Sequence, residues 1–327
     1  MKNPLTLPGG TTYGTPMAMF TWETVPSPSE TTDFLACPQY HAYRWGDERW
    51  AARCVGNATR VATLSKAWHA GLAARLRGGD GLPTAQADYR RRLQQMALDG
   101  YEWEDAPYPE ALLTELCRVT VLEGEALAPP SAVECRLGHA VIDLLNVPEA
   151  HIIDHKLLIL RDARWIADRL HAFQTRWQFR DYLWRASERF TTPFSLSVHC
   201  VVLVEERDKK GKPTGAFLPP TTVLEPVTVT QTQLKRWQDG AERVWQRMTH
   251  KMYYFIDEPP ERAPTESPFR LAVEVERKTP FQDLTKCANF GYGKPCEFYN
   301  ACHGAGLNEV EFVRVPRRQQ EEKNDES

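Results

Sequence analysis

The stretch that decides the fold is GHAVIDLLNVPEAHIIDHK, residues 138–156. Val, Ile and Leu dominate the run 138–145, and they dominate again in the run 150–160, so both are predicted to be short β-strands. The residues between them, NVPEA (146–150), form a tight link. We therefore expect the two strands to be neighbours in a hairpin at the centre of the fold.

Each of the two strands ends on charged side chains. Asp143 closes the first run, and Asp154 and Lys156 close the second. Residues two apart in a strand share a face, so Asp154 and Lys156 project together, and in a hairpin Asp143 can reach the same place. Two adjacent carboxylates repel each other unless a cation neutralises them, and Mg²⁺ suits such oxygen ligands. A neighbouring lysine can orient the attacking water or stabilise charge on a phosphate. The bland alternative is that all three are polar, solvated ends of strands.

The rest of the chain alternates between helical and strand patterns. Apolar residues recur at three and four positions in 60–76, as expected of a helix. Thr230 and Gln233 form a capping-box pattern that predicts a helix start. The full expectation is a helix opening after Ser29 or Thr31, helices at 60–76, 85–98, 162–189 and 232–248, strands at 116–124, 138–145, 150–160 and 194–206, a turn at 208–212 with a returning strand, and a loop at 280–303.

This order predicts an α/β fold in which helices flank a mixed β-sheet. Residues 1–30 are rich in chain breakers and are expected to be a flexible arm, residues 31–315 a single domain, and the polar residues 316–327 a disordered tail. Both chain ends carry cysteines, which suggests that the ends meet.

Composition narrows the class of protein. The hydrophobic content of 42% is that of a globular chain, and the net charge of −3 means that any nucleic-acid surface must be a local cluster. No apolar run approaches the roughly 20 residues that cross a bilayer, and residues 1–21 do not form a secretory signal. We expect an intracellular protein with no membrane partner, whose thiols are reduced.

Three of the eight cysteines cluster near the C-terminus. Cys287, Cys296 and Cys302 lie within sixteen residues, and Cys37 is the candidate fourth ligand. Thiolates bind both iron–sulfur clusters and structural zinc. Zinc, with Cys37 or His303 as fourth ligand, and plain reduced thiols remain alternatives. The other cysteines are interpreted as core residues: Cys54, Cys117, Cys135 and Cys200.

Basic and aromatic residues alternate along 162–189. Arginine forks bind phosphates and aromatic rings stack on bases. Acidic residues offset much of this charge, so most of the arginines are interpreted as a solvated face and the tryptophans Trp165, Trp177 and Trp184 as core. Tyr89, with the arginines at 90–92, is a second candidate phosphate contact.

The order of these motifs resembles a known family. A G-x-x-x-x-D motif ending at Asp143, then D-x-K at Asp154 and Lys156, then Q-x-x-x-Y at Gln178 and Tyr182 resembles the PD-(D/E)XK nuclease superfamily in its RecB-like exonuclease branch. That branch has a histidine on an early helix, here matched by His69, although Ser65 stands where the family has glycine.

The cysteines extend the resemblance. F-x-x-C-P at Cys37 with a C-terminal trio resembles the iron–sulfur staple of AddB-type and CRISPR-adaptation nucleases, and YGKPCEFYNAC is similar to the end of phage and prophage members. The family's frequent C-x-x-C is absent, because eight residues separate Cys287 from Cys296.

The resemblance implies a restriction-endonuclease-like core with helical additions and a C-terminal cysteine-bearing loop. It implies Mg²⁺- or Mn²⁺-dependent hydrolysis of DNA phosphodiesters, exonucleolytic on single-stranded ends. Asp143, Asp154 and His69 would hold the metal, Lys156 would position water, and Gln178 and Tyr182 would order the substrate. Cys37, Cys287, Cys296 and Cys302 would hold a [4Fe–4S] cluster that closes the domain.

The setting implied by the resemblance is the cytoplasm of a bacterial or phage-infected cell, with protein partners undetermined. Two alternatives stay open: a CRISPR-type spacer-trimming nuclease, and a DNA-binding scaffold of the same fold without cleavage.

Overall fold

The structure is a computed structural model that describes residues 20–36, 38–45, 49–124, 132–208, 213–256 and 311–315. It is a mixed α/β fold, as expected, and its main sheet has the strand order β4-β5-β6-β7-β8, with β9 also paired to β7. The strands are β4 (Ala132–Leu137), β5 (Ala140–Asn146), β6 (His151–Leu160), β7 (Ser195–Arg207), β8 (Pro213–Phe217) and β9 (Thr221–Val227).

The hairpin expected over 138–160 is confirmed. β5 and β6 are antiparallel, with Leu144 opposite Ile153 and Asn146 opposite His151. β6 then pairs with β7 in parallel over its whole length. A parallel pair needs a crossover connection, and the segment between these strands supplies it as helices on one face of the sheet.

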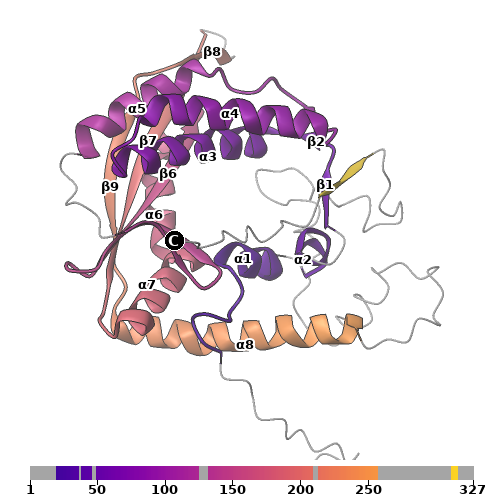
Figure 1. Ribbon diagram of the computed structural model, residues 1–327, viewed down its shortest axis with the longest axis vertical. Coiled ribbons are helices and arrows are strands. Elements are labelled where there is room, and N and C mark those ends of the chain that lie inside the picture. The colour runs from indigo at the N-terminus through magenta and orange to yellow at the C-terminus, as the bar shows by residue number, and fades with distance from the viewer. Residues whose placement is uncertain are drawn as a thin grey trace, which may run out of the picture.

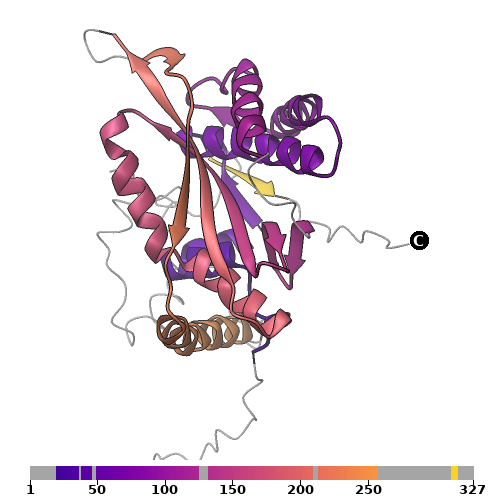
Figure 2. The same ribbon diagram turned by 90° about the vertical axis from the view of Figure 1, so that its left-hand side faces the viewer.

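Helices cover both faces of β6 and β7 (Figures 1 and 2). One core cluster joins residues of β5, β6 and β7, such as Ile152 and Val198, to helices α7 (Trp177–Phe190) and α8 (Gln231–Ile256). The other joins Leu157 and Val201 to helices α3 (Asn57–Leu76), α4 (Gly81–Leu98) and α5 (Ala111–Gly124). Because side chains alternate along a strand, neighbouring residues of β6 belong to different clusters.

Two expected elements were wrong. Residues 116–124 are not a strand but the second half of α5, because Leu113 and Leu116 lie three apart and are both fully buried against the other helices. The helix expected over 162–189 is broken into four: η1 (Ala163–Trp165), α6 (Ile166–His171), η2 (Ala172–Thr175) and α7. Arg176 has extended backbone angles between η2 and α7.

Three of the predicted helices, one further predicted strand and the predicted capping box are present. The helices at 60–76, 85–98 and 232–248 are present in longer form as α3, α4 and α8, and the strand at 194–206 is β7. The capping box is formed, since Thr230 Oγ1 accepts from the Gln233 amide at 3.2 Å and Gln233 Oε1 from the Thr230 amide at 2.8 Å. The returning strand is split into β8 and β9, with Pro219 and Pro220 between them.

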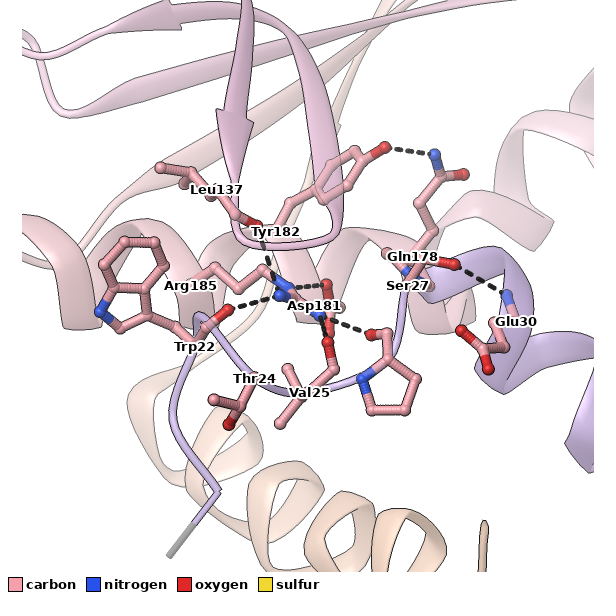
Figure 3. A network of polar contacts seen from close by, with 12 residues as sticks. Trp22, Thr24, Val25, Ser27, Glu30, Leu137, Gln178, Asp181, Tyr182 and Arg185 are labelled. Carbon is pink, nitrogen blue, oxygen red and sulfur yellow. Dashed lines mark hydrogen bonds and ion pairs between the residues drawn. The ribbon is translucent and has the colours of Figure 1, made fainter. Parts of the chain in front are cut away.

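The segment 20–27 is held against the core by one arginine (Figure 3). Arg185 of α7 is fully buried and paired with Asp181 at 2.6 Å. Its remaining nitrogens donate to main-chain carbonyls of Trp22 at 2.6 Å, Pro26 at 2.7 Å, Leu137 at 3.3 Å and Val25 at 3.4 Å. Residues 20–30 therefore depart from the flexible arm expected over 1–30, and helix α1 (Pro28–Ala36) already begins within that range.

An early strand pairs with the last described strand. After helix α2 (Pro38–Trp45), strand β1 (Arg49–Ala52) pairs antiparallel with β10 (Phe312–Val315), and a parallel pair joins β2 (Cys54–Val55) to β3 (Glu102–Trp103). The sequence signalled none of these short strands, because they depend on partners far along the chain. None of the described helices is both long and apolar enough for a membrane span.

Candidate functional site

Asp143 lies where β5 and β6 separate. The antiparallel pairing of the hairpin ends where Leu144 lies opposite Ile153, and one residue further along β5 the Asp143 carboxylate accepts the main-chain N–H of His155 at 2.7 Å. A side chain thus takes the place of a ladder carbonyl. Asp143 and Asp154 lie within their strands and not at the strand ends that the sequence suggested. They come together because β5 and β6 stop pairing at this point.

Asp154 and Lys156 share one face of β6, as predicted. The Lys156 Nζ atom lies 2.6 Å from Asp154 Oδ2. Asp154 is 1% exposed, whereas the Lys156 side chain retains 21% exposure. Phe179 of α7 covers this face, with its ring centroid 5.6 Å from Lys156 Nζ. The lysine is therefore the more accessible member of a buried ion pair.

His69 approaches from α3. Its Nδ1 atom lies 3.4 Å from Asp143 Oδ1, while its Nε2 atom is buried and has no hydrogen-bond partner among the described residues. The indole of Trp68 packs edge-on against the imidazole at 5.0 Å. The structure thus brings together His69, Asp143, Asp154 and Lys156 from α3, β5 and β6.

Gln178 and Tyr182 lie on the first turns of α7. The Gln178 amide donates to the Tyr182 hydroxyl at 2.7 Å, and Figure 3 shows the two side chains directed toward each other. Burial raises the pKa of Tyr182 well above its usual value, and the nearby charges of Asp154 and Asp143 raise it further. The phenol therefore stays protonated, and it lies close enough to the two carboxylates for their charges to act on it.

The two carboxylates differ in their electrostatics. Burial alone would raise the pKa of Asp143, but His69, Lys156 and His155 together hold that pKa below its usual value. Burial raises the pKa of Asp154 to about 6, with Asp143 adding to the rise and Lys156 opposing it. Asp143 is therefore an ionised carboxylate, whereas Asp154 loses its proton less readily because a second negative charge would be buried beside the first.

The donor chemistry suits a hard divalent cation, because a cation between the two carboxylates would keep both ionised. In the part of the chain that the structure describes, however, no three His, Cys, Asp or Glu side chains are already gathered as a metal shell. Asp143 is engaged by His69 and Asp154 by Lys156. Binding of a cation would have to replace these pairings.

A histidine pair behind the site was missed by sequence reasoning. His155 and His199 are neighbours in the register of β6 and β7, and their Nδ1 atoms are 2.9 Å apart. Burial lowers the pKa of His155 to about 3, so its ring is neutral. His155 lies inside the D-x-K motif, but only knowledge of the parallel register could identify His199 as its partner.

The second candidate phosphate contact, Tyr89 with the arginines at 90–92, lies on α4. Tyr89 is buried and donates to the Tyr108 carbonyl, Arg90 is paired with Glu110, and the arginines at 91 and 92 are paired with Asp88. Each of the three arginines therefore has a carboxylate partner, and their contact with phosphate stays a prediction.

The cysteines and tryptophans that were expected to be core residues differ in how far they are buried. Among the four cysteines interpreted as core, Cys200 is buried, Cys117 and Cys135 are partly exposed, and Cys54 is exposed. Trp184 is buried and Trp177 packs against the core, but Trp165 is 49% exposed. Cys37, Cys287, Cys296, Cys302 and His303 lie outside the described residues.

Comparison of the chain with protein-family models, with curated proteins and with solved structures gave no match. The functional argument therefore depends on the geometry of the site and on the order of the motifs in the sequence.

Proposed function

We propose that this protein is a metal-dependent DNA nuclease of the PD-(D/E)XK type with a restriction-endonuclease-like core. One observation carries the proposal: His69, Asp143, Asp154 and Lys156 converge from three elements where β5 and β6 separate. The mixed sheet, antiparallel through β4, β5 and β6 and parallel from β6 to β7, supports it as the scaffold that such a site needs.

The chain's own groups can perform distinct parts of phosphodiester hydrolysis. Asp143, Asp154 and His69 would hold Mg²⁺ or Mn²⁺, which supplies Lewis-acid polarisation and a water of lowered pKa. Lys156 places a positive charge directly beside the carboxylates, where it can orient the attacking water or stabilise charge on the phosphate. Tyr182, kept protonated by burial, can donate a hydrogen bond to substrate.

The test is cleavage of end-labelled single- and double-stranded DNA by anaerobically purified protein, with and without Mn²⁺. Replacing Asp154 by asparagine should lower the rate at least about 100-fold, since even outer-shell partners of a metal cost roughly 10- to 100-fold. Lys156→Met should also lose most activity. Lys235→Met is the matched control, because Lys235 is exposed on α8 with a carboxylate partner of its own, Asp239. Wild-type cleavage by Asp154→Asn would refute the assigned site.

We further propose that Cys37, Cys287, Cys296 and Cys302 hold a [4Fe–4S] cluster. The pairing of β1 with β10 supports this, because it places the segment that follows Cys37 beside the segment that follows Cys302. The pair is antiparallel, so the two segments enter it from opposite ends, which are about 10 Å apart. Anaerobic protein should contain iron and sulfide and absorb near about 400 nm. Cys37→Ser should bleach it, whereas Cys54→Ser, at an exposed thiol, should not. If metal analysis found stoichiometric zinc and no iron, the four cysteines would be a zinc site instead of a cluster site. If it found neither metal, the proposal of a metal site would be refuted.

A further inference from the structure

Trp165 is exposed, unlike other large aromatic residues of the segment and helix that follow it in the chain. Its side chain is 49% exposed, whereas Trp184 is 4% and Phe173 is 0% exposed. An exposed indole offers a large, flat apolar face on which another flat group can stack.

The exposed indole is held on an ordered turn. Asp162 caps η1 by accepting the main-chain N–H of Arg164 at 3.0 Å, and its other carboxylate oxygen pairs with the Arg164 guanidinium at 2.9 Å. The guanidinium carbon lies 5.6 Å from the centroid of the Trp165 ring. The indole ring and the planar guanidinium therefore lie side by side on the turn. Because the Asp162 cap already orders this turn, binding a ligand would lose less conformational entropy there.

The turn belongs to a basic segment that joins the two halves of the site. Residues 161–176 contain four arginines against two aspartates, in a chain whose net charge is −3. The segment begins where β6, which carries Asp154 and Lys156, ends, and it leads into α7, which carries Gln178 and Tyr182. From Lys156 to the end of β6 is about 13 Å, at roughly 3.3 Å per residue.

The far end of this segment is anchored to the sheet. Gln174 of η2 donates to the Pro226 carbonyl at 2.7 Å and accepts from the Thr228 amide at 3.0 Å, both at the end of β9. Figure 2 shows the segment on the side of the sheet away from α3 and α4. A surface fixed at both ends can bind a ligand in a set position relative to the site.

We propose that residues 161–176 form a strand-binding surface on which Trp165 stacks against an unpaired base of single-stranded DNA. Arg164 and its neighbouring arginines contact the flanking phosphates. Unpaired bases expose their faces to an aromatic ring, whereas the bases of a duplex are already stacked. The inference rests on the proposed nuclease function and adds to it the part of the chain that holds the strand a few nucleotides from the cleaved bond.

The test is fluorescence anisotropy with labelled oligothymidylate and with a labelled duplex, in EDTA so that no cleavage occurs. Trp165→Ala should weaken oligothymidylate binding about 10-fold, while duplex binding stays within about twofold. Trp165→Phe should retain most of the affinity. Arg164→Gln should weaken binding and reduce the salt dependence by about one ion. Leu98→Ala is the matched control, because Leu98 is 75% exposed and is the last residue of α4, which carries none of the residues assigned to the site.

The outcomes separate this surface from the site itself. If the protein cleaves DNA but Trp165→Ala binds oligothymidylate like the wild type, or no worse than Leu98→Ala, the strand-binding surface is refuted and the nuclease proposal stands. If the unaltered protein neither binds nor cleaves DNA, the nuclease proposal fails and this inference fails with it.

Discussion

Replacing Arg185 by leucine should lower the free energy of unfolding by about 3–5 kcal/mol. The side chain is fully buried and its guanidinium is paired with Asp181 at 2.6 Å. It also donates to the carbonyls of Trp22 and Pro26 at 2.6 and 2.7 Å, and to two more at longer range. Leucine would leave these acceptors without a donor inside the protein.

The magnitude follows from the burial of both partners. Removing one member of a buried ion pair typically costs about 3–5 kcal/mol, because the remaining charge is uncompensated. Set against a typical domain stability of about 5–15 kcal/mol, the loss is about a fifth or more. A double replacement of Asp181 and Arg185 by leucine removes the stranded carboxylate, so it should be less destabilising than the sum of the two single changes.

The measurement is urea unfolding at 25 °C followed by circular dichroism. Arg236→Leu serves as control, because Arg236 is exposed on α8. Its effect should stay within about 0.5 kcal/mol. We call the contacts of Arg185 with Asp181 and with the main-chain carbonyls the clamp. If the free energy of unfolding of Arg185→Leu lay within about 1 kcal/mol of the wild-type value, the clamp would not be a main stabilising contact of segment 20–27.

Three further outcomes follow from the same contacts. Tyr182→Phe should slow cleavage less than Asp154→Asn does, because it removes a positioning hydrogen bond and not a metal ligand; equal loss would point to a direct chemical role. Iodoacetamide at pH 8 should label Cys54, which is exposed, and spare Cys200, whose pKa burial raises to about 12; peptide mass spectrometry reads this out. Burial raises the folded-state pKa of Asp181 to about 6, above the unfolded value of about 3.9, so this group's contribution to stability should fall as pH rises from about 4 to 6, and Asp181→Asn should remove that slope in urea unfolding.

The parts of the fold that could be predicted are the local ones. The hairpin of β5 and β6 follows from two apolar runs and a tight link, and the capping box of α8 from two residues three apart. The strand predicted over 116–124 was wrong. That window is rich in β-branched residues, but Leu113 and Leu116 make their decisive contacts with helices distant in sequence, and the segment is part of α5. Packing outweighed local propensity there.

The candidate site divides in the same way. Asp154 and Lys156 are two apart on one strand, so their ion pair is a local consequence of the pleat. The approach of His69 to Asp143 joins α3 to β5 and was expected only from the order of motifs. His199 could not be found, because its link to His155 requires the register of two parallel strands that a long crossover separates.

Helix α7 links stability to the site. Gln178 and Tyr182 are four residues apart and hydrogen-bond to each other, while Asp181 and Arg185, also four apart, hold the clamp (Figure 3). The two pairs are offset by less than one turn, so whatever moves the clamp also moves the tyrosine. Loss of cleavage in a clamp variant would therefore report on the position of α7 and not on chemistry. The chemistry is better tested at Lys156, whose partly exposed side chain lies on β6 and contributes nothing to the clamp.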